Sequence, residues 1–162
     1  MDFQSEEIPF TSTDYYTREM GTGLRRVFFA VEELVDPSRL AELKKRSDEL
    51  ETRFSRRESP ATVDDGRRGS RAQEVPESCR RVNFDPGLLT LGRLILASTK
   101  DNAQRIPLSD GVYAEITLLY RKGDFEPLRW TYPDYQSESY RAILREIRWR
   151  YKTQLDEELQ AR

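Results

Sequence analysis

The chain has 162 residues, 35% of them charged, and a net charge of −2, which fits one domain and excludes a global attraction to nucleic acid or to an anionic membrane. It contains no histidine and one cysteine, Cys79, so Ser-His-Asp and Cys-His catalysis, histidine-bound zinc and an intramolecular disulfide are excluded. Because we find neither a signal-peptide pattern nor an apolar run of about 20 residues, we expect a cytoplasmic protein without a membrane span.

The first third of the chain predicts a β-hairpin followed by a helix. Residues 8–16 and 24–34 have the composition of strands, and the stretch 19–23 between them is typical of a turn. Asp36 followed by Pro37 indicates a helix start, because aspartate accepts backbone N–H groups and proline suits the first turn. Apolar residues then recur at helical spacing, namely Leu40, Leu43, Leu50 and Phe54.

Residues 55–78 lack aromatic side chains and mix both charges with glycine and proline. Such a segment buries too little apolar surface to offset the cost of ordering the chain, so we predict a disordered insertion within a single domain that spans 1–162. The alternative is a nucleic-acid contact through five arginines, but five acidic residues in the same stretch cancel their charge. Nucleic acid therefore ranks last among the partners considered.

The middle of the chain predicts a second helix between two short strands. After a strand at 80–84, Asp85 and Pro86 repeat the helix-start pattern, and a helix running to about Ser98 would be apolar around much of its circumference. A strand at 104–108 follows. The apolar residues of this helix are Leu88, Leu91, Leu94, Ile95 and Leu96.

Residues 112–121 form the clearest strand pattern, with Glu115 in its middle. A turn at 122–124 and a returning strand at 125–130 complete a hairpin. We assign to the core the alternating set that does not contain Glu115. This set consists of Val112, Ala114, Ile116, Leu118 and Tyr120.

A last helix follows Pro133, with Ser137 or Ser139 as its cap. Its apolar residues lie at i, i+3, i+4 and i+7 spacing. The order of strands and helices predicts an α+β domain with a mainly antiparallel sheet and about three helices packed mostly on one face. The stripe of the last helix comprises Tyr140, Ile143, Leu144, Ile147, Tyr151 and Leu155.

Five sequence blocks point to a family: TDYYTREMG, VNFDPGLL, LASTKDNAQRI, GVYAEITLLY and WTYPDY. In these blocks the chain resembles the bacterial proteins grouped as domain of unknown function 4416. That family has no established activity, so the resemblance implies an uncharacterised protein. Its members usually begin with a further strand and helix, which we expect to be absent here, and often carry histidine where this chain has Asn102 and Gln104.

Polar residues alternate with aromatic ones between 81 and 135, and we place the candidate site there. Lys100 and Arg105 would bind an anion, because a guanidinium group matches phosphate or carboxylate oxygens in pairs. Aromatic rings would stack on a base or another ring. The predicted ligand-binding residues are Lys100, Arg105, Tyr113, Asp14, Tyr15 and Tyr132, and the ionisable group as a whole contains Asp14, Glu19, Asp85, Lys100, Asp101, Arg105, Glu115 and Asp134.

Three functions stay open at this point. The leading hypothesis is a binding module for a small anionic ligand, a nucleotide being one candidate. The second is a carboxylate- or magnesium-dependent enzyme in which Glu115 and Asp101 are catalytic. The third is an interaction protein, including a homo-oligomer, that uses an aromatic face or a sheet edge. The sequence leaves open whether the protein is an enzyme, and nothing in it points to zinc, haem or a dinucleotide.

Some of the proposed site residues also have a structural explanation. Asp85 fits a helix cap, because Asp-Pro is a frequent helix entry. Glu115 and Arg105 fit a cross-strand pair, which would contribute about 0.2–1 kcal/mol.

Overall fold

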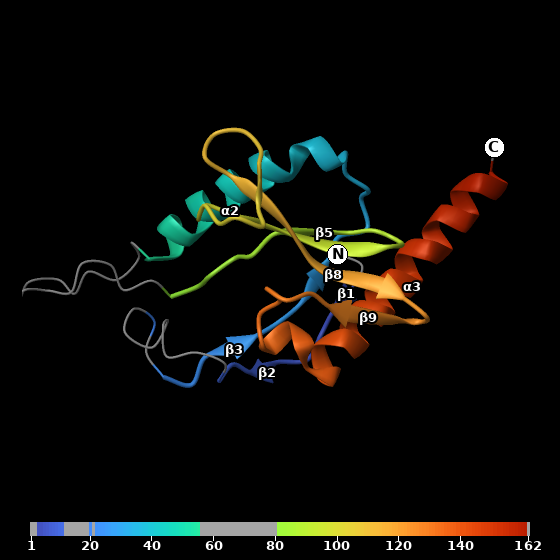
Figure 1. The fold of residues 1–162 in the computed structure, drawn as a ribbon, viewed down its shortest axis with the longest axis horizontal. Helices are drawn as coiled ribbons and strands as arrows, with labels where there is room; N and C mark the ends of the chain where they lie inside the picture. Colours follow the sequence, from blue (N-terminus) through green and yellow to red (C-terminus); the bar gives the residue numbers. More distant parts are fainter. Residues whose placement is uncertain (1–2, 12–19, 21, 56–80, 162) are drawn as a thin grey trace, which may run out of the picture.

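The structure, a computed structural model, describes residues 3–11, 20, 22–55 and 81–161 (Figure 1). Apart from Ser55, the insertion predicted at 55–78 lies outside the described residues. Most of the second half of the predicted strand at 8–16 lies outside them as well.

An antiparallel sheet forms the centre of the described fold. Its strands are β5 (Gly87–Leu89), β6 (Arg93–Ser98), β7 (Ile106–Pro107), β8 (Tyr113–Arg121) and β9 (Asp124–Pro127). The strand order is β5-β6-β8-β7, and β9 also pairs with β8. β7 pairs with residues 113–114 of β8 and β9 with residues 118–121, so both lie along one edge of β8 and leave residues 115–117 between them.

The helix predicted from Pro86 to Ser98 is wrong, because these residues form β5 and β6 with a tight connection between them. A strand that is covered on both faces carries a near-continuous apolar run, which periodicity cannot separate from a buried helix. Gly87 permits close pairing here, since a Cβ atom at this position would lie 2.8 Å from the carbonyl oxygen of Ile95. The described residues 81–84 form no strand, which also corrects the prediction.

The two helices of the described residues pack on opposite faces of the sheet. They are α2 (Leu40–Ser55), which follows the 3-10 turn η1 (Pro37–Arg39), and α3 (Glu138–Gln160). α2 runs along the upper side of the strands in Figure 1, whereas α3 begins below β9. The core on the α2 side contains Leu40, Ala41, Ala97 and Val112. The core on the α3 side contains Leu94, Leu118, Phe125, Tyr135, Tyr140 and Leu144.

The assignment of faces follows from β6, whose successive residues alternate between these two cores. The predicted α+β class and the mainly antiparallel sheet are therefore confirmed. The expected number and placement of the helices are corrected for the part of the chain that the structure describes: two helices instead of about three, one on each face instead of mostly on one. The sheet is covered on both sides because its strands are apolar on both sides.

A β-bulge interrupts the middle of β8. Leu94 pairs with Leu118, whereas the next residue, Ile95, pairs with Ile116, so Thr117 is an extra residue in β8. An extra residue shifts the two-residue alternation of a strand by one position. Side chains beyond the bulge therefore point to the face opposite to the one that simple alternation predicts.

The bulge divides the set predicted for one core face between the two cores: Val112 and Ala114 belong to the core on the α2 side, whereas Leu118 and Tyr120 belong to the core on the α3 side. Glu115 and Leu118 both point to the α3 side, since their partners in β6 do so. Glu115 is 2% exposed and Thr117 is fully buried. A carboxylate thus lies inside the fold, because the face of β8 opposite to Val112 and Ala114 is covered as well.

Four short strands near the N-terminus form two antiparallel pairs. They are β1 (Phe3–Gln4) with β4 (Phe29–Ala30), and β2 (Ile8–Pro9) with β3 (Arg25–Arg26). The β2–β3 pair confirms the predicted hairpin for the described residues. Ile8 and Phe28 pack against the core on the α3 side, so this region brings Arg26 up to the sheet.

Three local signals, at one turn and two helix starts, are confirmed. Lys122 and Gly123 have φ angles of +50° and +90° in the two-residue turn between β8 and β9, as a type I′ hairpin turn requires. Asp36 accepts a hydrogen bond from the N–H of Ser38 at 2.8 Å where η1 begins. Ser137 caps α3 with its side chain. Each of these signals depends only on neighbours in sequence.

Asp124 connects the turn between β8 and β9 to α3. Its carboxylate accepts hydrogen bonds from Arg141 and, at 2.6 Å, from Arg145. Burial acts to raise the pKa of Asp124. The hydrogen bonds from Arg145 and from the backbone N–H of Phe125, together with the charges of both arginines, outweigh burial and hold this pKa below its usual value.

We expect Asp124→Asn to remove a pH-dependent part of the stability. A carboxyl group whose pKa is lower in the folded state stabilises the fold fully above its unfolded pKa of about 3.9, and this contribution is lost as the pH falls through the folded pKa. Urea denaturation between about pH 6 and about pH 3 should therefore show a larger loss of unfolding free energy for the wild type than for D124N. Equal losses would contradict this role of Asp124.

Candidate functional site

A buried arginine, Arg105, lies between the ends of β6, β7 and β8. Its Nε donates to Glu115 Oε2 at 2.8 Å, and its Nη2 donates to the hydroxyl of Tyr132 at 2.9 Å. Its Nη1 donates to Ser98 Oγ at 2.8 Å and to the carbonyl oxygen of Lys100 at 2.7 Å. Five protein groups from four segments of the chain thus meet at what we call the Arg105 centre, made up of Arg105 and these four partners.

The Arg105 centre is almost closed to solvent on the side of the ion pair. The side chains of Arg105 and Glu115 are each 3% exposed, and Gln104 donates a further hydrogen bond to the same Glu115 oxygen at 3.1 Å. Burial acts to lower the pKa of Arg105, but the hydrogen bond and charge of Glu115, with the contribution of Tyr132, raise it above its usual value. The guanidinium therefore stays charged, and the pair is neutral as a whole.

A second arginine, Arg26, forms a looser centre on the α3 side. Its Nη2 lies 3.7 Å from Asp85 Oδ2 and 3.8 Å from Asp134 Oδ2, and its Nη1 donates to the hydroxyl of Tyr135 at 3.3 Å. The guanidinium also stands over three rings, those of Phe10, Tyr135 and Tyr140. Burial raises the pKa of the Tyr135 hydroxyl, so this group is a neutral partner at ordinary pH.

Both centres lie at the same end of the sheet, which we call the polar end. The N–H of Ala97 donates to the carbonyl oxygen of Pro86 at 3.0 Å, which places Asp85 next to the end of β6 where Ser98 binds Arg105. The segment 130–135 supplies Tyr132 to one centre and Asp134 to the other. The polar end therefore joins four of the five sequence blocks around two arginines.

The bulge in β8 fixes the segment that carries Tyr132. The indole Nε1 of Trp130 donates to the carbonyl oxygen of Ile116 at 2.8 Å. The hydroxyl of Thr131 donates to the carbonyl oxygen of Thr117 at 2.5 Å. These bonds satisfy carbonyl groups in the part of β8 that neither β7 nor β9 pairs with. Thr131 is buried, whereas the ring of Tyr132 beside it reaches the surface and is 47% exposed.

The structure brings some of the predicted site residues together and separates others. Glu115, Arg105 and Tyr132 are in contact, and Lys100 contributes its carbonyl group while its side chain is exposed. Tyr113 is half-buried opposite Ser98 in the sheet, and Asp101 is exposed in the loop after β6. Asp14, Tyr15 and Glu19 lie outside the described residues.

Sequence reasoning missed Arg26, which organises Asp85 and Asp134. The available signal was a charged residue within the strand-like run GLRRVFF, where one of two adjacent arginines must face the core side. It also misread Asp85 as a helix cap, because no helix begins at that position. The aspartate instead faces Arg26 across 3.7 Å.

The carboxylates of the polar end do not form a metal site in the part of the chain that the structure describes. No group of three or more aspartate, glutamate, cysteine or histidine side chains is close enough there to hold a metal ion. Glu115 is held by Arg105 and Gln104 rather than by a second carboxylate. Separately, the described helices include none that is long and apolar enough to cross a membrane.

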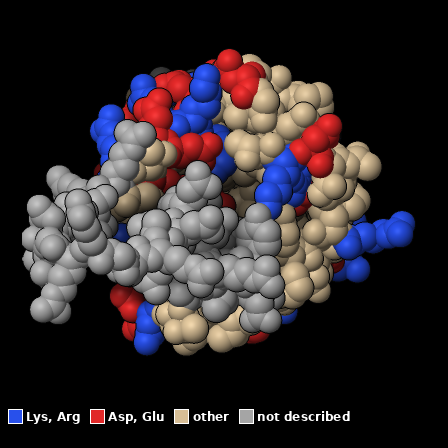
Figure 2. All heavy atoms as spheres, turned by 90° about the vertical axis from the view of Figure 1, so that its left-hand side faces the viewer, with Lys and Arg blue, Asp and Glu red and all other residues tan. Residues whose placement is uncertain are grey.

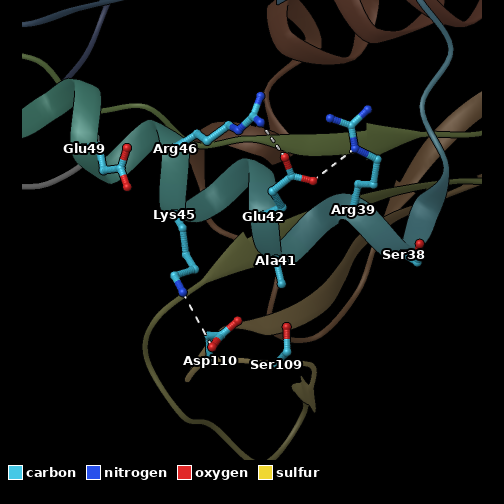
Figure 3. A pocket seen from close by; sticks show the side chains of 9 residues that line it. All are labelled: Ser38, Arg39, Ala41, Glu42, Lys45, Arg46, Glu49, Ser109 and Asp110. Carbon is cyan, nitrogen blue, oxygen red and sulfur yellow. Dashed lines mark hydrogen bonds and ion pairs between the residues drawn. The ribbon is translucent and has the colours of Figure 1, made fainter.

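A shallow open depression of about 440 Å³ lies elsewhere, between the start of α2 and the turn at 109–110 (Figure 3). Five of its six charged side chains are paired with one another: Glu42 bridges Arg39 at 3.1 Å and Arg46 at 2.8 Å, and Lys45 lies 3.5 Å from Asp110. Basic and acidic side chains are likewise interleaved on the face shown in Figure 2. Its three basic and three acidic side chains leave the depression without a net charge, and we do not regard it as the site.

Comparison with known proteins identifies a family without an activity. A family model described as a domain of unknown function (DUF4416) matches residues 1–151 of the 162. No curated protein and no solved structure matches the chain. The matched region contains both arginine centres and every element of the fold up to most of α3. The chain therefore belongs to the DUF4416 family of proteins of unknown function.

Proposed function

We propose that this protein is a binding module for a small anionic ligand, and that the ligand binds at the polar end beside Arg105. The observation that carries the proposal is a buried, permanently charged guanidinium whose outermost partner is the exposed ring of Tyr132. Such a group can supply directed hydrogen bonds to phosphate or carboxylate oxygens. A nucleotide is the candidate in which Tyr132 would also meet an aromatic base.

The charge balance of the polar end requires a second cation for an anion to bind. Arg105 is neutralised by Glu115, so it supplies direction rather than net charge. Lys100 supplies the charge in this proposal, because its backbone carbonyl lies 2.7 Å from Arg105 Nη1 and its side chain starts beside the centre at the surface. This arrangement favours binding over catalysis, since the carboxylate of Glu115 already accepts two hydrogen bonds and is 2% exposed.

We expect an anionic ligand to raise the melting temperature of the wild type and to do so far less for Lys100→Ala. At a ligand concentration of about 100 times Kd, binding adds about 2.7 kcal/mol to the stability, which for a chain of this size corresponds to roughly 5–10 °C. The probes are inorganic phosphate, nucleoside mono- and diphosphates and phosphorylated metabolites. Lys45→Ala is the matched control, because it removes one lysine that is 54% exposed on α2.

The comparison of the two lysine variants decides the result. A shift that is retained in Lys45→Ala and reduced in Lys100→Ala supports the proposed site. A shift that both variants retain means that the anion binds elsewhere. If none of the probes shifts the melting temperature of the wild type, the proposed function is wrong.

A further inference from the structure

Arg105 is arranged so that one position on its guanidinium group can be exchanged. Nε and Nη2 form the edge that binds a carboxylate or phosphate through two parallel hydrogen bonds. In this protein the edge is divided: Glu115 Oε2 occupies Nε at 2.8 Å, and the neutral hydroxyl of Tyr132 occupies Nη2 at 2.9 Å. The hydroxyl of Tyr132 therefore takes the place that the second oxygen of a carboxylate would have in a two-bond pair with Arg105.

The three side chains that bond Arg105 differ in their access to solvent. Glu115 is 2% exposed and is fixed further by Gln104, and Ser98 is half-buried at the end of β6. Tyr132 is 47% exposed, so its ring can leave the guanidinium by side-chain rotation without disturbing the core. The Nη1 and Nε bonds would hold Arg105 in place meanwhile.

The backbone on the N-terminal side of Tyr132 is anchored independently of its hydroxyl. The hydroxyl of Thr131 donates to the carbonyl oxygen of Thr117 and accepts from the N–H of Leu128 at 2.7 Å. A movement of the Tyr132 ring therefore needs no movement of the segment before it. A charged oxygen atom is also a stronger acceptor for a guanidinium N–H than a neutral phenol.

We propose that Tyr132 is a displaceable latch on Arg105, whose hydroxyl holds the Nη2 position until an oxygen atom of an anionic ligand replaces it. The latch rests on the proposed function, because it needs an anion at the polar end. It also assigns the ligand class more narrowly: the ligand presents an oxyanion, such as a phosphate group, to Nη2. Lys100 offsets the negative charge of the ligand, and the released ring of Tyr132 is available to cover the ligand.

The latch predicts that removing the Tyr132 hydroxyl strengthens binding. In Tyr132→Phe the Nη2 position is vacant before the ligand arrives, so the anion no longer competes with a hydrogen bond. We expect Kd for inorganic phosphate and for adenosine monophosphate, measured by isothermal titration calorimetry, to fall about 2- to 10-fold, the range that one net hydrogen bond represents. The melting temperature of the free variant should fall, and its increase with phosphate should exceed that of the wild type.

Tyr151→Phe on α3 is the matched control, since it makes the same chemical change away from the polar end, and its Kd should equal that of the wild type. If Tyr132→Phe binds phosphate with equal or lower affinity than the wild type, the latch is wrong while the proposed function stands. If neither the wild type nor Tyr132→Phe binds either probe, both proposals are wrong. Tighter binding in Tyr132→Phe alone supports the latch.

Discussion

Replacing Glu115 with alanine is expected to lower the free energy of unfolding by about 3–5 kcal/mol, the range measured when one member of a buried ion pair is removed. The variant leaves the guanidinium of Arg105 buried and unpaired, because the side chains of both residues are 3% exposed in the wild type. Arginine cannot escape this cost by losing its proton. Gln104 would lose its partner as well.

Two further variants separate charge from packing in this experiment. Glu115→Gln keeps an oxygen acceptor for Arg105 Nε and should cost less than Glu115→Ala in urea denaturation at neutral pH. The double variant Arg105→Met with Glu115→Leu removes both charges, and we expect it to recover most of the lost stability, because an apolar pair of similar size often equals a buried ion pair. A cost of less than about 1 kcal/mol for Glu115→Ala, the range of exposed pairs, would contradict the burial of this pair.

The ion pair changes how the binding hypothesis for Arg105 must be tested. From the sequence alone, Arg105→Ala would be expected to abolish a ligand-induced melting shift and leave the fold intact. In the structure this substitution removes four hydrogen bonds and leaves Glu115 buried without its cation. A lost shift in that variant would not distinguish binding from folding, which is why Lys100 and Tyr132 carry the tests.

The parts of the fold that sequence predicted correctly are those decided by near neighbours. The turn at Lys122 and Gly123 needs two residues with positive φ, and the start of η1 needs only the carboxylate of Asp36 within reach of the next turn. The strand 113–121 was recognisable because aliphatic residues alternate with others from 112 to 118 in the sequence. Each of these signals is complete within about ten residues of the chain.

The errors arose where distant parts of the chain decide the structure. Residues 87–98 are apolar enough for a buried helix, and only the pairing of β5 with β6 and of β6 with β8 makes them strands. The bulge at Thr117 depends on how β6 and β8 align, and no local composition announces it. A one-residue shift of this kind placed Leu118 on the same face as Glu115, where alternation predicts opposite faces.

In the candidate site, too, sequence predicted some contacts and missed those that depend on distant parts of the chain. The contact between Glu115 and Arg105 was considered from the sequence as a cross-strand pair, and the two side chains do meet. The burial of Glu115 depends on how residues 104 and 105 close over β8, which sequence does not reveal. Asp85 and Asp134 were both proposed, but Arg26, which lies close to both, comes from a strand more than 50 residues earlier in the chain.

Phe125→Ala is expected to lower the free energy of unfolding by about 3–5 kcal/mol as well, but for an apolar reason. Phe125 is fully buried and its ring packs edge-on against Tyr120, with 5.1 Å between the centroids. Truncation would leave a cavity where β8, β9 and α3 meet. Phe125→Leu, which keeps most of the volume, should cost clearly less in the same urea denaturation experiment.

Phe125 and Glu115 therefore provide two losses of stability of similar size with different consequences for binding. Tyr120, the partner of Phe125, lies five residues along β8 from Glu115, which is about 16 Å in an extended strand. Below its melting temperature, Phe125→Ala should bind phosphate with the affinity of the wild type, whereas Glu115→Ala should change that affinity because it alters Arg105 directly. If both variants lost binding in proportion to their lost stability, the polar end would depend on the whole fold rather than on the Arg105 centre.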